Sequence, residues 1–131
     1  MEGGIQNILN LERGTTMVSH EREKELITIT IEGASGAGLK SLIGPAEGWS
    51  DYVMRKVELE AFGHSPEHAH PWPHINYILE GKGAILLDGK EIPAEKGTVA
   101  YIPPNRKHQF INTGSEPFHL ICIVPKEGHI A

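Results

Sequence analysis

The chain of 131 residues contains a single cysteine, Cys122. One cysteine excludes an internal disulfide and a cysteine-based zinc cluster, so histidine must carry any metal chemistry. The chain also lacks an apolar run of about 20 residues, the length that a membrane-spanning helix needs. Its basic residues are scattered singly and the formal net charge is −5, which argues against the clustered positive face that nucleic-acid binding requires.

The N-terminus shows no basic segment followed by an apolar stretch, as a secretion signal would, and we therefore expect a cytoplasmic protein. The length suits one domain, and the apolar fraction of 39% is ordinary for a folded chain. Residues 1–25 mix Gly, Glu, Arg, Ser and Thr, and predict a short N-terminal arm. Residues 26–131 are expected to form the single domain.

Short strand-like runs separated by turn signals fill the chain from residue 26 onward. The run 26–31 alternates apolar and polar residues, many of them β-branched, which is typical of a half-buried strand. After residue 51 no segment keeps a 3.6-residue apolar period, and the close spacing of turns favours an all-β fold with a closed sheet. Asp88-Gly89 is a hairpin signal, because both turn positions need positive φ. The predicted strands cover residues 26–31, 39–43, 51–59, 66–70, 74–79, 83–88, 98–102, 107–112 and 118–124.

Histidine is the informative residue type, since four of the eight histidines lie between residues 64 and 74. On a strand, His68 and His70 would project from one face about 7 Å apart, close enough to share one ion. Two prolines then favour a bend that could return His74 to the same cavity, and His108 could enter from the facing side. Separate solvated roles are the alternative, but they would not explain the common spacing. Neutral imidazoles suit Mn, Fe, Co, Ni, Cu or Zn, whereas Mg and Ca prefer oxygen ligands.

These spacings resemble the cupin superfamily, whose two motifs read G-x5-H-x-H-x3,4-E-x6-G and G-x5-P-x-G-x2-H-x3-N. The first motif appears here as His68-x-His70-x3-His74-x6-Gly81, and the second as Gly97-x5-Pro103-x-Asn105-x2-His108-x3-Asn112. The resemblance covers residues 38–126 with the flanking strands. It implies a jelly-roll-like antiparallel β-barrel in which His68, His70, His74 and His108 bind one divalent metal ion.

The sequence departs from the family pattern at three positions. Gly63 lies one residue too close to His68, a difference that a bulge could absorb. Asn105 replaces a turn glycine, and asparagine is the residue that next most readily adopts a left-handed conformation. His74 occupies the position of the usual glutamate, which makes the chain similar to small four-histidine cupins. Four neutral ligands leave the +2 charge of the ion uncompensated, so we expect a small anionic substrate.

Strand alternation suggests further residues of the cavity. Phe110 shares the inward face of His108 and is expected to form a wall of the pocket. Arg55 has the parity of the more apolar face of its strand and could orient an anionic substrate; the alternative is an ion pair with a carboxylate at the barrel rim. Between residues 118 and 124 both faces are apolar, so parity does not decide whether Cys122 points inward.

Four ligands in an octahedral field leave two coordination positions, which suit a bidentate substrate, or a substrate together with dioxygen. The resemblance therefore implies a mononuclear Mn- or Fe-dependent oxygenase-like enzyme, with Zn, Ni, Cu and Co as other metals that fit. A sugar or hydroxy-acid isomerase or lyase is an alternative, but it demands a general base, and no carboxylate is placed beside the ligands. A non-catalytic binding protein is the third alternative. Cupins commonly pair, so we also expect a homodimer in which strand 26–31 completes a neighbour's sheet.

Overall fold

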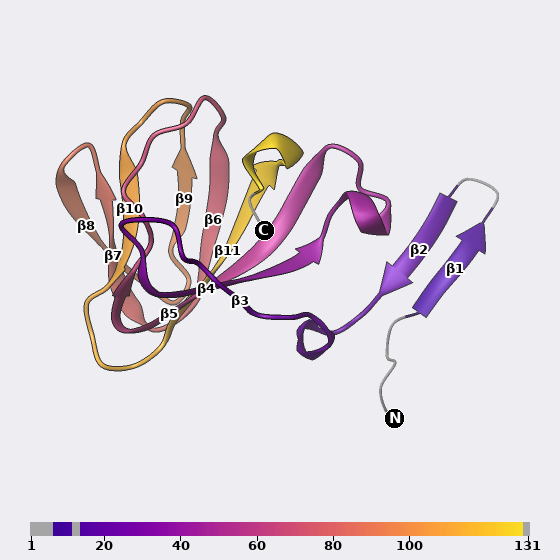
Figure 1. The fold of residues 1–131 in the computed structure, drawn as a ribbon, viewed down its shortest axis with the longest axis horizontal. Coiled ribbons are helices and arrows are strands. Elements are labelled where there is room, and N and C mark those ends of the chain that lie inside the picture. Colours follow the sequence, from indigo (N-terminus) through magenta and orange to yellow (C-terminus); the bar gives the residue numbers. More distant parts are fainter. Residues whose placement is uncertain (1–6, 12–13, 130–131) are drawn as a thin grey trace.

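The computed structural model describes residues 7–11 and 14–129, in which antiparallel strands predominate (Figure 1). The strands are β1 (Asn7–Leu11), β2 (Gly14–Val18), β3 (Ile27–Thr28), β4 (Ser35–Ile43), β5 (Tyr52–His64), β6 (His74–Glu80), β7 (Lys82–Leu87), β8 (Lys90–Glu95), β9 (Val99–Ile102), β10 (His108–Asn112) and β11 (Phe118–Pro125). Three single 3-10 turns accompany them: η1 (Glu21–Glu23), η2 (Pro45–Glu47) and η3 (Lys126–Gly128). These described residues form no α-helix, and none of their helical turns has the length and apolar character needed to cross a membrane.

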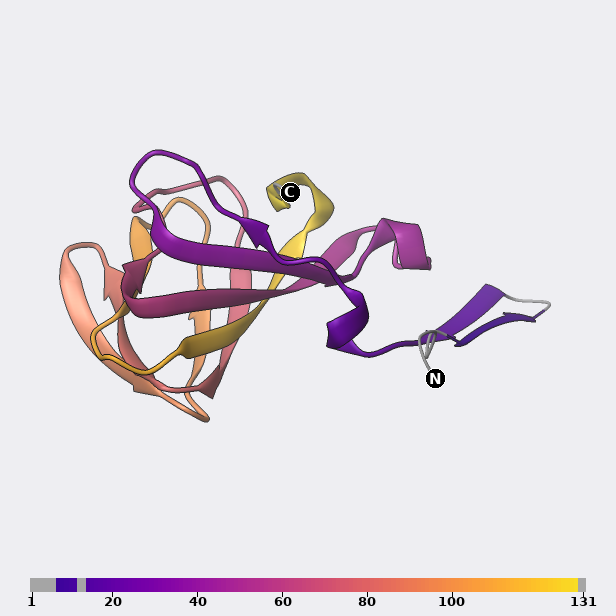
Figure 2. The same ribbon diagram turned by 60° about the horizontal axis from the view of Figure 1, so that its bottom comes forward.

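Nine strands form one antiparallel sheet in the order β8-β7-β10-β5-β11-β6-β9, with β4 paired to β5 and β3 paired to β4. This sheet curls on itself into a barrel (Figures 1 and 2). The predicted all-β architecture with an antiparallel, barrel-like sheet is therefore confirmed. β1 and β2 form a separate hairpin that extends away from the barrel (Figure 2). The boundary that the sequence suggests between arm and domain, at residues 25 and 26, stays a prediction.

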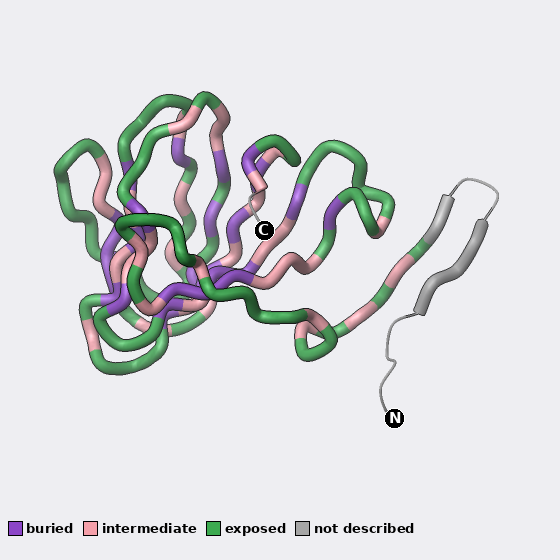
Figure 3. Tube along the Cα trace, viewed as in Figure 1, coloured by how far each residue is buried: buried purple, intermediate pink, exposed green. Residues whose placement is uncertain are grey.

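Buried residues alternate with more exposed ones along β6 and β11, and the buried positions gather in the barrel (Figure 3). On β11, Phe118, Leu120, Cys122 and Val124 are buried, and the residues between them are half-buried. β11 lies between β5 and β6 in the sheet, where Cys122 pairs with Arg55 and Asn76, so these three side chains share one face. The question that parity left open is thus answered, because Cys122 belongs to the interior face.

The predicted turns adopt the expected backbone conformations. Asp88-Gly89 joins β7 to β8 with Leu87 opposite Lys90, and the two turn residues have φ angles of 50° and 82°. These are the left-handed values that such a two-residue turn needs. Asn105, which stands in place of a glycine, has a φ of 65° and therefore also lies in the left-handed region.

Three predicted features of the strands need correction. Residues 66–70 form no strand, and an isolated bridge between His68 and His108 holds them to β10. Of the run 26–31, only residues 27–28 form a strand, β3, which pairs with β4 of its own chain on one side. That its other edge completes a neighbour's sheet stays a prediction. No strand is predicted over the residues of β8, because Pro93 and the charged residues around it break the apolar pattern. β8 is an edge strand, where a proline removes no hydrogen bond that the sheet needs.

Exposed apolar residues cover the outer face of β6 and β9. Ile75 lies opposite Tyr101 and Tyr77 lies opposite Val99, and all four residues are at least 47% exposed. β9 is also an edge of the sheet, so one side of its backbone has no partner strand. Contiguous exposed apolar side chains often mark a surface that contacts another protein.

Candidate metal centre

Backbone pairing brings His68 and His108 together. The amide of His68 donates to the carbonyl of His108 at 3.0 Å, and the amide of His108 donates to the carbonyl of His68 at 2.9 Å. Two residues that exchange both hydrogen bonds present their side chains on the same face. The two imidazole rings accordingly lie 5.0 Å apart, measured between centroids.

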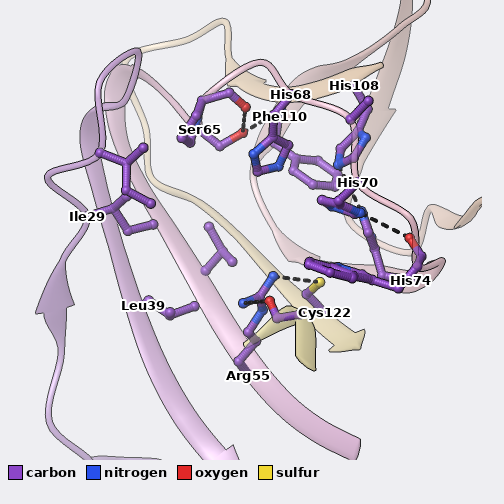
Figure 4. A pocket seen from close by; sticks show the side chains of 16 residues that line it. Ile29, Leu39, Arg55, Ser65, His68, His70, His74, His108, Phe110 and Cys122 are labelled. Atoms are coloured by element: carbon purple, nitrogen blue, oxygen red, sulfur yellow. Dashed lines mark hydrogen bonds between the residues drawn. The ribbon is translucent and has the colours of Figure 1, made fainter. Parts of the chain in front are cut away.

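His70 and His74 reach the same cavity from the loop before β6 and from its first residue (Figure 4). The ring centroid of His70 lies 4.9 Å from those of His68 and His108, and the centroid of His74 lies 4.6 Å from that of His108. One ligand nitrogen from each of His68, His70 and His108 lies within 4.8 Å of the others. Nε2 of His74 lies 2.9 Å from Nε2 of His108. All four histidines of the two sequence motifs thus belong to one cluster.

Hydrogen bonds hold three of these rings in the tautomer that leaves Nε2 unprotonated. Nδ1 of His108 donates to the backbone carbonyl two residues earlier at 2.8 Å, and Nδ1 of His70 donates to the carbonyl two residues later at 3.0 Å. Nδ1 of His74 donates to Oδ1 of Asn76 at 2.8 Å, since the amide nitrogen of Asn76 faces the backbone of β11 instead. Carbonyl and amide oxygens can only accept a hydrogen bond, so each Nδ1 carries the proton and each Nε2 presents a lone pair.

The Nε2 lone pairs of His74 and His108 therefore face each other without a proton between them. Such an arrangement is repulsive unless a cation is shared. Two nitrogens bound to one ion at about 2.1 Å and at right angles would lie about 3.0 Å apart, which matches the distance in this structure. The donor set and its spacing thus fit a divalent transition-metal ion.

Burial keeps these imidazoles neutral. His74 and His108 are buried, His70 is half-buried, and His68 reaches the surface although its ring lines the cavity. Desolvation, followed by the nearby His108, lowers the pKa of His74 to about 3 and that of His68 to about 4. Desolvation also lowers the pKa of His70 and of His108. Near pH 7 all four rings are neutral, which is the state in which imidazole binds a metal.

The cluster lies in the wall of a cavity of about 240 Å³. Most of the cavity surface is apolar, and none of the described residues that line it carries a carboxylate. Besides the histidines, the lining includes Ile29, Ile31, Leu39, Val57, Ser65 and Pro66.

Arg55 and Phe110, which strand parity singles out, both line this cavity. Phe110 is 6% exposed, and its ring centroid lies 6.2 Å from that of His108. Arg55 lies on β5 across the cavity from the histidine cluster (Figure 4). Its Nη1 donates to the carbonyl of Gly128 at 3.3 Å and its Nη2 donates to Sγ of Cys122 at 3.7 Å. Within the described part of the chain, no carboxylate forms an ion pair with Arg55.

Two parts of the cavity wall were not anticipated from the sequence. Ile29 and Ile31 contribute from the segment that follows β3, and Gly128 contributes from η3. The alternation of residues 26–31 is the signal that could have placed the two isoleucines on one face. No sequence pattern marks Gly128, because its position depends on how the chain turns after β11.

Fold and site together define a small antiparallel β-barrel with a histidine cluster in its cavity. The chain belongs to the cupin family, since residues 55–124 match the cupin domain. Among curated sequences, a glucose-6-phosphate isomerase from Thermococcus gammatolerans is 48% identical over 61 residues, which cover 42% of this chain and 32% of that protein. The match thus spans about a third of the length of this relative.

Solved structures share the fold. The polyketide cyclase RemF from Streptomyces resistomycificus superposes with a TM-score of 0.78 over 82% of this chain and 78% of that one, at 24% identity. A cupin-2 domain from Rhodospirillum rubrum superposes with a TM-score of 0.73 over 82% of this chain and 72% of that one, at 21% identity. At these identities the likeness concerns the fold alone.

Proposed function

We propose that this chain is a metal-dependent isomerase that interconverts the aldose and ketose forms of a small phosphorylated sugar. The observation that carries the proposal is the convergence of four imidazoles on one cavity, with two Nε2 atoms 2.9 Å apart. The sequence similarity to the glucose-6-phosphate isomerase from T. gammatolerans directs the choice of substrate. This choice favours the isomerase alternative over the oxygenase-like function that the sequence first suggested.

The ligands of the ion in this proposal are His68, His70, His74 and His108. A divalent ion held there would supply a Lewis acid that polarises the substrate carbonyl. Neutral ligands leave its charge uncompensated, which favours an anionic substrate. We expect Mn or Fe in the cell; Zn, Cu, Ni and Co also suit imidazole, and metal availability decides occupancy among them.

The other cavity residues bind and enclose the substrate. Arg55 is placed to hold its anionic end, since the guanidinium group lies across the cavity from the histidines (Figure 4). Phe110 and Leu39 are buried parts of the wall, and their apolar surfaces limit the access of water to the reacting carbons. Both roles are orienting ones and require no proton transfer by these residues.

Isomerisation moves one hydrogen from C2 to C1 and one proton from the C2 hydroxyl to the C1 oxygen. Carrying the carbon-bound hydrogen as a proton needs a general base, and the described lining residues include no carboxylate. Direct migration of that hydrogen with its electron pair needs no such base. We infer this route, which removes the objection that the sequence raises against an isomerase.

The test is an assay of the interconversion of glucose 6-phosphate and fructose 6-phosphate by the full chain, loaded separately with Mn, Fe or Zn. We expect turnover that H74Q and H108Q abolish and that H20Q, a change at an exposed histidine, leaves intact. Oxygen uptake with catechols or diketones, in place of sugar turnover, would establish the oxygenase-like function. An absence of turnover with both substrate classes would establish a binding protein.

A homodimer is part of the same proposal. The exposed apolar face of β6 and β9, with Ile75, Tyr77, Val99 and Tyr101, supports it and is proposed as the contact surface. We expect light scattering at micromolar concentration to give twice the mass of the chain. V99K should shift the mass toward the monomer, and a monomeric unmodified chain would contradict the proposal.

A further inference from the structure

Trp72 contacts one ring of the histidine cluster in two ways. Its indole stacks on the imidazole of His70, with centroids 4.8 Å apart and planes inclined by 12°. Its carbonyl accepts a hydrogen bond from Nδ1 of the same imidazole at 3.0 Å. The stacking therefore sets the plane of this ring, and the hydrogen bond sets which of its nitrogens is available to a metal.

Backbone pairing positions the other three histidines more firmly than His70. His74 and His108 each begin a strand, and His68 exchanges two backbone hydrogen bonds with His108. His70 lies in the loop before β6, where its carbonyl accepts a hydrogen bond from the amide of Asn105 at 2.7 Å. The side chain of a half-buried loop residue needs packing contacts to keep one orientation, and the indole of Trp72 supplies such a contact.

Trp72 is itself held by packing against Gly128. The indole Nε1 is buried and has no hydrogen-bond partner among the described residues, so no polar contact of this atom fixes the ring. A Cβ atom on Gly128 would lie 2.7 Å from Cε2 and 2.8 Å from Cδ1 of the indole, and closer still to Nε1. The five-membered ring of the indole thus lies directly against the glycine, with no room for a methyl group between them.

Space, and not backbone conformation, requires a glycine at position 128. The φ angle of Gly128 lies outside the left-handed region, so other residues can adopt its backbone conformation. The turn η3 around it is anchored to β5 and to the residue before β5. The carbonyl of Gly128 accepts a hydrogen bond from Nη1 of Arg55 at 3.3 Å, and the amide of Lys126 donates to the carbonyl of Asp51 at 2.9 Å. The buried glycine is therefore a fixed surface against which Trp72 packs.

We propose that Gly128 and Trp72 are positioning residues of the metal centre: η3 supports the indole, and the indole orients the imidazole of His70 toward the ion. This role rests on the proposed function in taking His70 as a metal ligand, but it does not depend on the substrate. Neither residue binds the ion, since both act through the ring of His70. The C-terminal turn thereby becomes part of the metal centre.

Competition with a chromogenic chelator for Zn measures the effect on metal affinity. G128A displaces the indole and should weaken Zn binding about tenfold or more, the usual cost of disturbing the partner of a metal ligand. G114A is the matched control, because a Cβ atom on Gly114 meets Oδ1 of Asn112 at an ordinary 3.9 Å and this glycine also lacks a left-handed φ. Zn affinity in G114A should equal that of the unmodified chain. Unchanged affinity in G128A would overturn the proposal.

Two double variants show whether Gly128 acts through Trp72 and His70. In H70Q the oriented ligand is absent, so adding G128A should change the Zn affinity by less than about twofold. In W72A the indole that the new methyl group would displace is absent, so adding G128A should again have little effect. A full additional loss in both backgrounds would assign the effect of G128A to a general disturbance of the cavity and contradict the proposal.

Variants at Trp72 test the same role in a chain that keeps Gly128. W72F retains a stacked ring and should keep most of the Zn affinity, whereas W72A should lose about tenfold. The visible absorption of the Co-loaded chain reports the ligand geometry, and its bands should shift in W72A and G128A but not in W72F. A purely structural role would lower the Tm of the metal-free chain and leave these bands in place. That result, or equal Zn affinities of W72F and W72A, would overturn the proposal.

Failure of the positioning role and failure of the proposed function are separable. Zn binding that weakens in G128A, in a chain without sugar turnover, would support the positioning role and overturn the isomerase. Sugar turnover combined with equal Zn affinities of G128A and G114A would support the isomerase and overturn the positioning role. A chain that binds neither Zn nor Co would overturn both.

Discussion

Oδ1 of Asn76 lies 2.8 Å from Nδ1 of His74, and this contact orients a buried ring of the histidine cluster from two residues along the same strand. Residues two apart on β6 share a face, so both side chains point into the barrel, where Asn76 is 1% exposed. The amide thereby holds the proton on Nδ1 and directs Nε2 toward His108. The position of one acceptor thus determines which nitrogen of His74 is available to a metal.

The N76A variant should bind metal about 10-fold to 100-fold more weakly, the usual cost of removing the partner that orients a ligand. N76D keeps an acceptor at the same place and should retain most of the affinity. Both can be measured by competition with a chromogenic chelator. An equal loss in the two variants would mean that packing at this site, and not the hydrogen bond, governs metal affinity.

Removing the metal should destabilise the barrel, because it leaves two lone pairs facing each other at 2.9 Å. An ion present at 100 times its dissociation constant stabilises the folded state by about 2.7 kcal/mol. For a chain of this size that corresponds to a rise of roughly 10 °C in Tm. This difference in Tm can be measured by calorimetric scans of the chain with Mn or Zn and of the chain treated with EDTA. H108Q should show little metal-dependent shift, and an unmodified chain without such a shift would contradict the metal centre.

Acid should weaken the contact between η1 and the barrel. Nζ of Lys56 on β5 lies 2.7 Å from Oε1 of Glu21, and this hydrogen bond lowers the pKa of Glu21 below its usual 4.5 although partial burial opposes the shift. The unfolded chain therefore takes up this proton first as the pH falls. The stabilisation is complete above pH 4.5 and is lost as the pH falls below it.

Unfolding by urea at pH 7, 5, 4 and 3 can test this. The free energy of unfolding of E21Q should lie below that of the unmodified chain at pH 7, and the gap should close toward pH 3. E23Q, at an exposed residue of the same turn, is the matched control and should show no such gap. A gap for E21Q that is constant with pH would assign the effect to packing.

Isomerisation in D2O should leave the ketose product almost free of deuterium at C1 and the aldose product almost free of deuterium at C2, because the hydrogen is proposed to migrate directly between these two carbons. The described cavity residues offer no carboxylate that could exchange a proton with solvent. Mass spectrometry of the ketose-to-aldose and aldose-to-ketose products measures the label. Incorporation of one deuterium per turnover would show that a base carries the proton, and would direct attention to the histidine rings.

Sequence reasoning predicts this fold best where the alternation of side chains is regular. The β7–β8 turn and the inward face of His108 follow from local patterns, since each depends on residues that are close in the chain. On β11 both faces are apolar, so local alternation does not show which face is inside. The pairing of Cys122 with residues of β5 and β6 shows that its side chain lies inside. β4 begins in a glycine-rich segment that resembles a break, because the strand is stabilised by its partner β5 and not by its own propensity.

The histidines of the cavity could be predicted because they follow local spacing patterns, whereas the parts of the cavity wall that depend on tertiary contacts could not. Spacing alone groups His68, His70 and His74, and the second motif adds His108. Contacts with the end of the chain could not be foreseen, since Gly128 meets Trp72 through the path of η3 and not through any pattern in sequence. Long-range contacts of this kind depend on tertiary packing.

His74 and His108 each begin a strand of the barrel, whereas His68 and His70 lie in a loop that an isolated bridge holds in place. Opening this loop would release two ligands while the other two keep their geometry. Capture and loss of an ion held by these four rings would therefore depend on this loop, whose backbone is restricted at Pro71 and Pro73. The rate of metal exchange would then depend on a few irregular residues, whereas the equilibrium affinity would depend on all four rings.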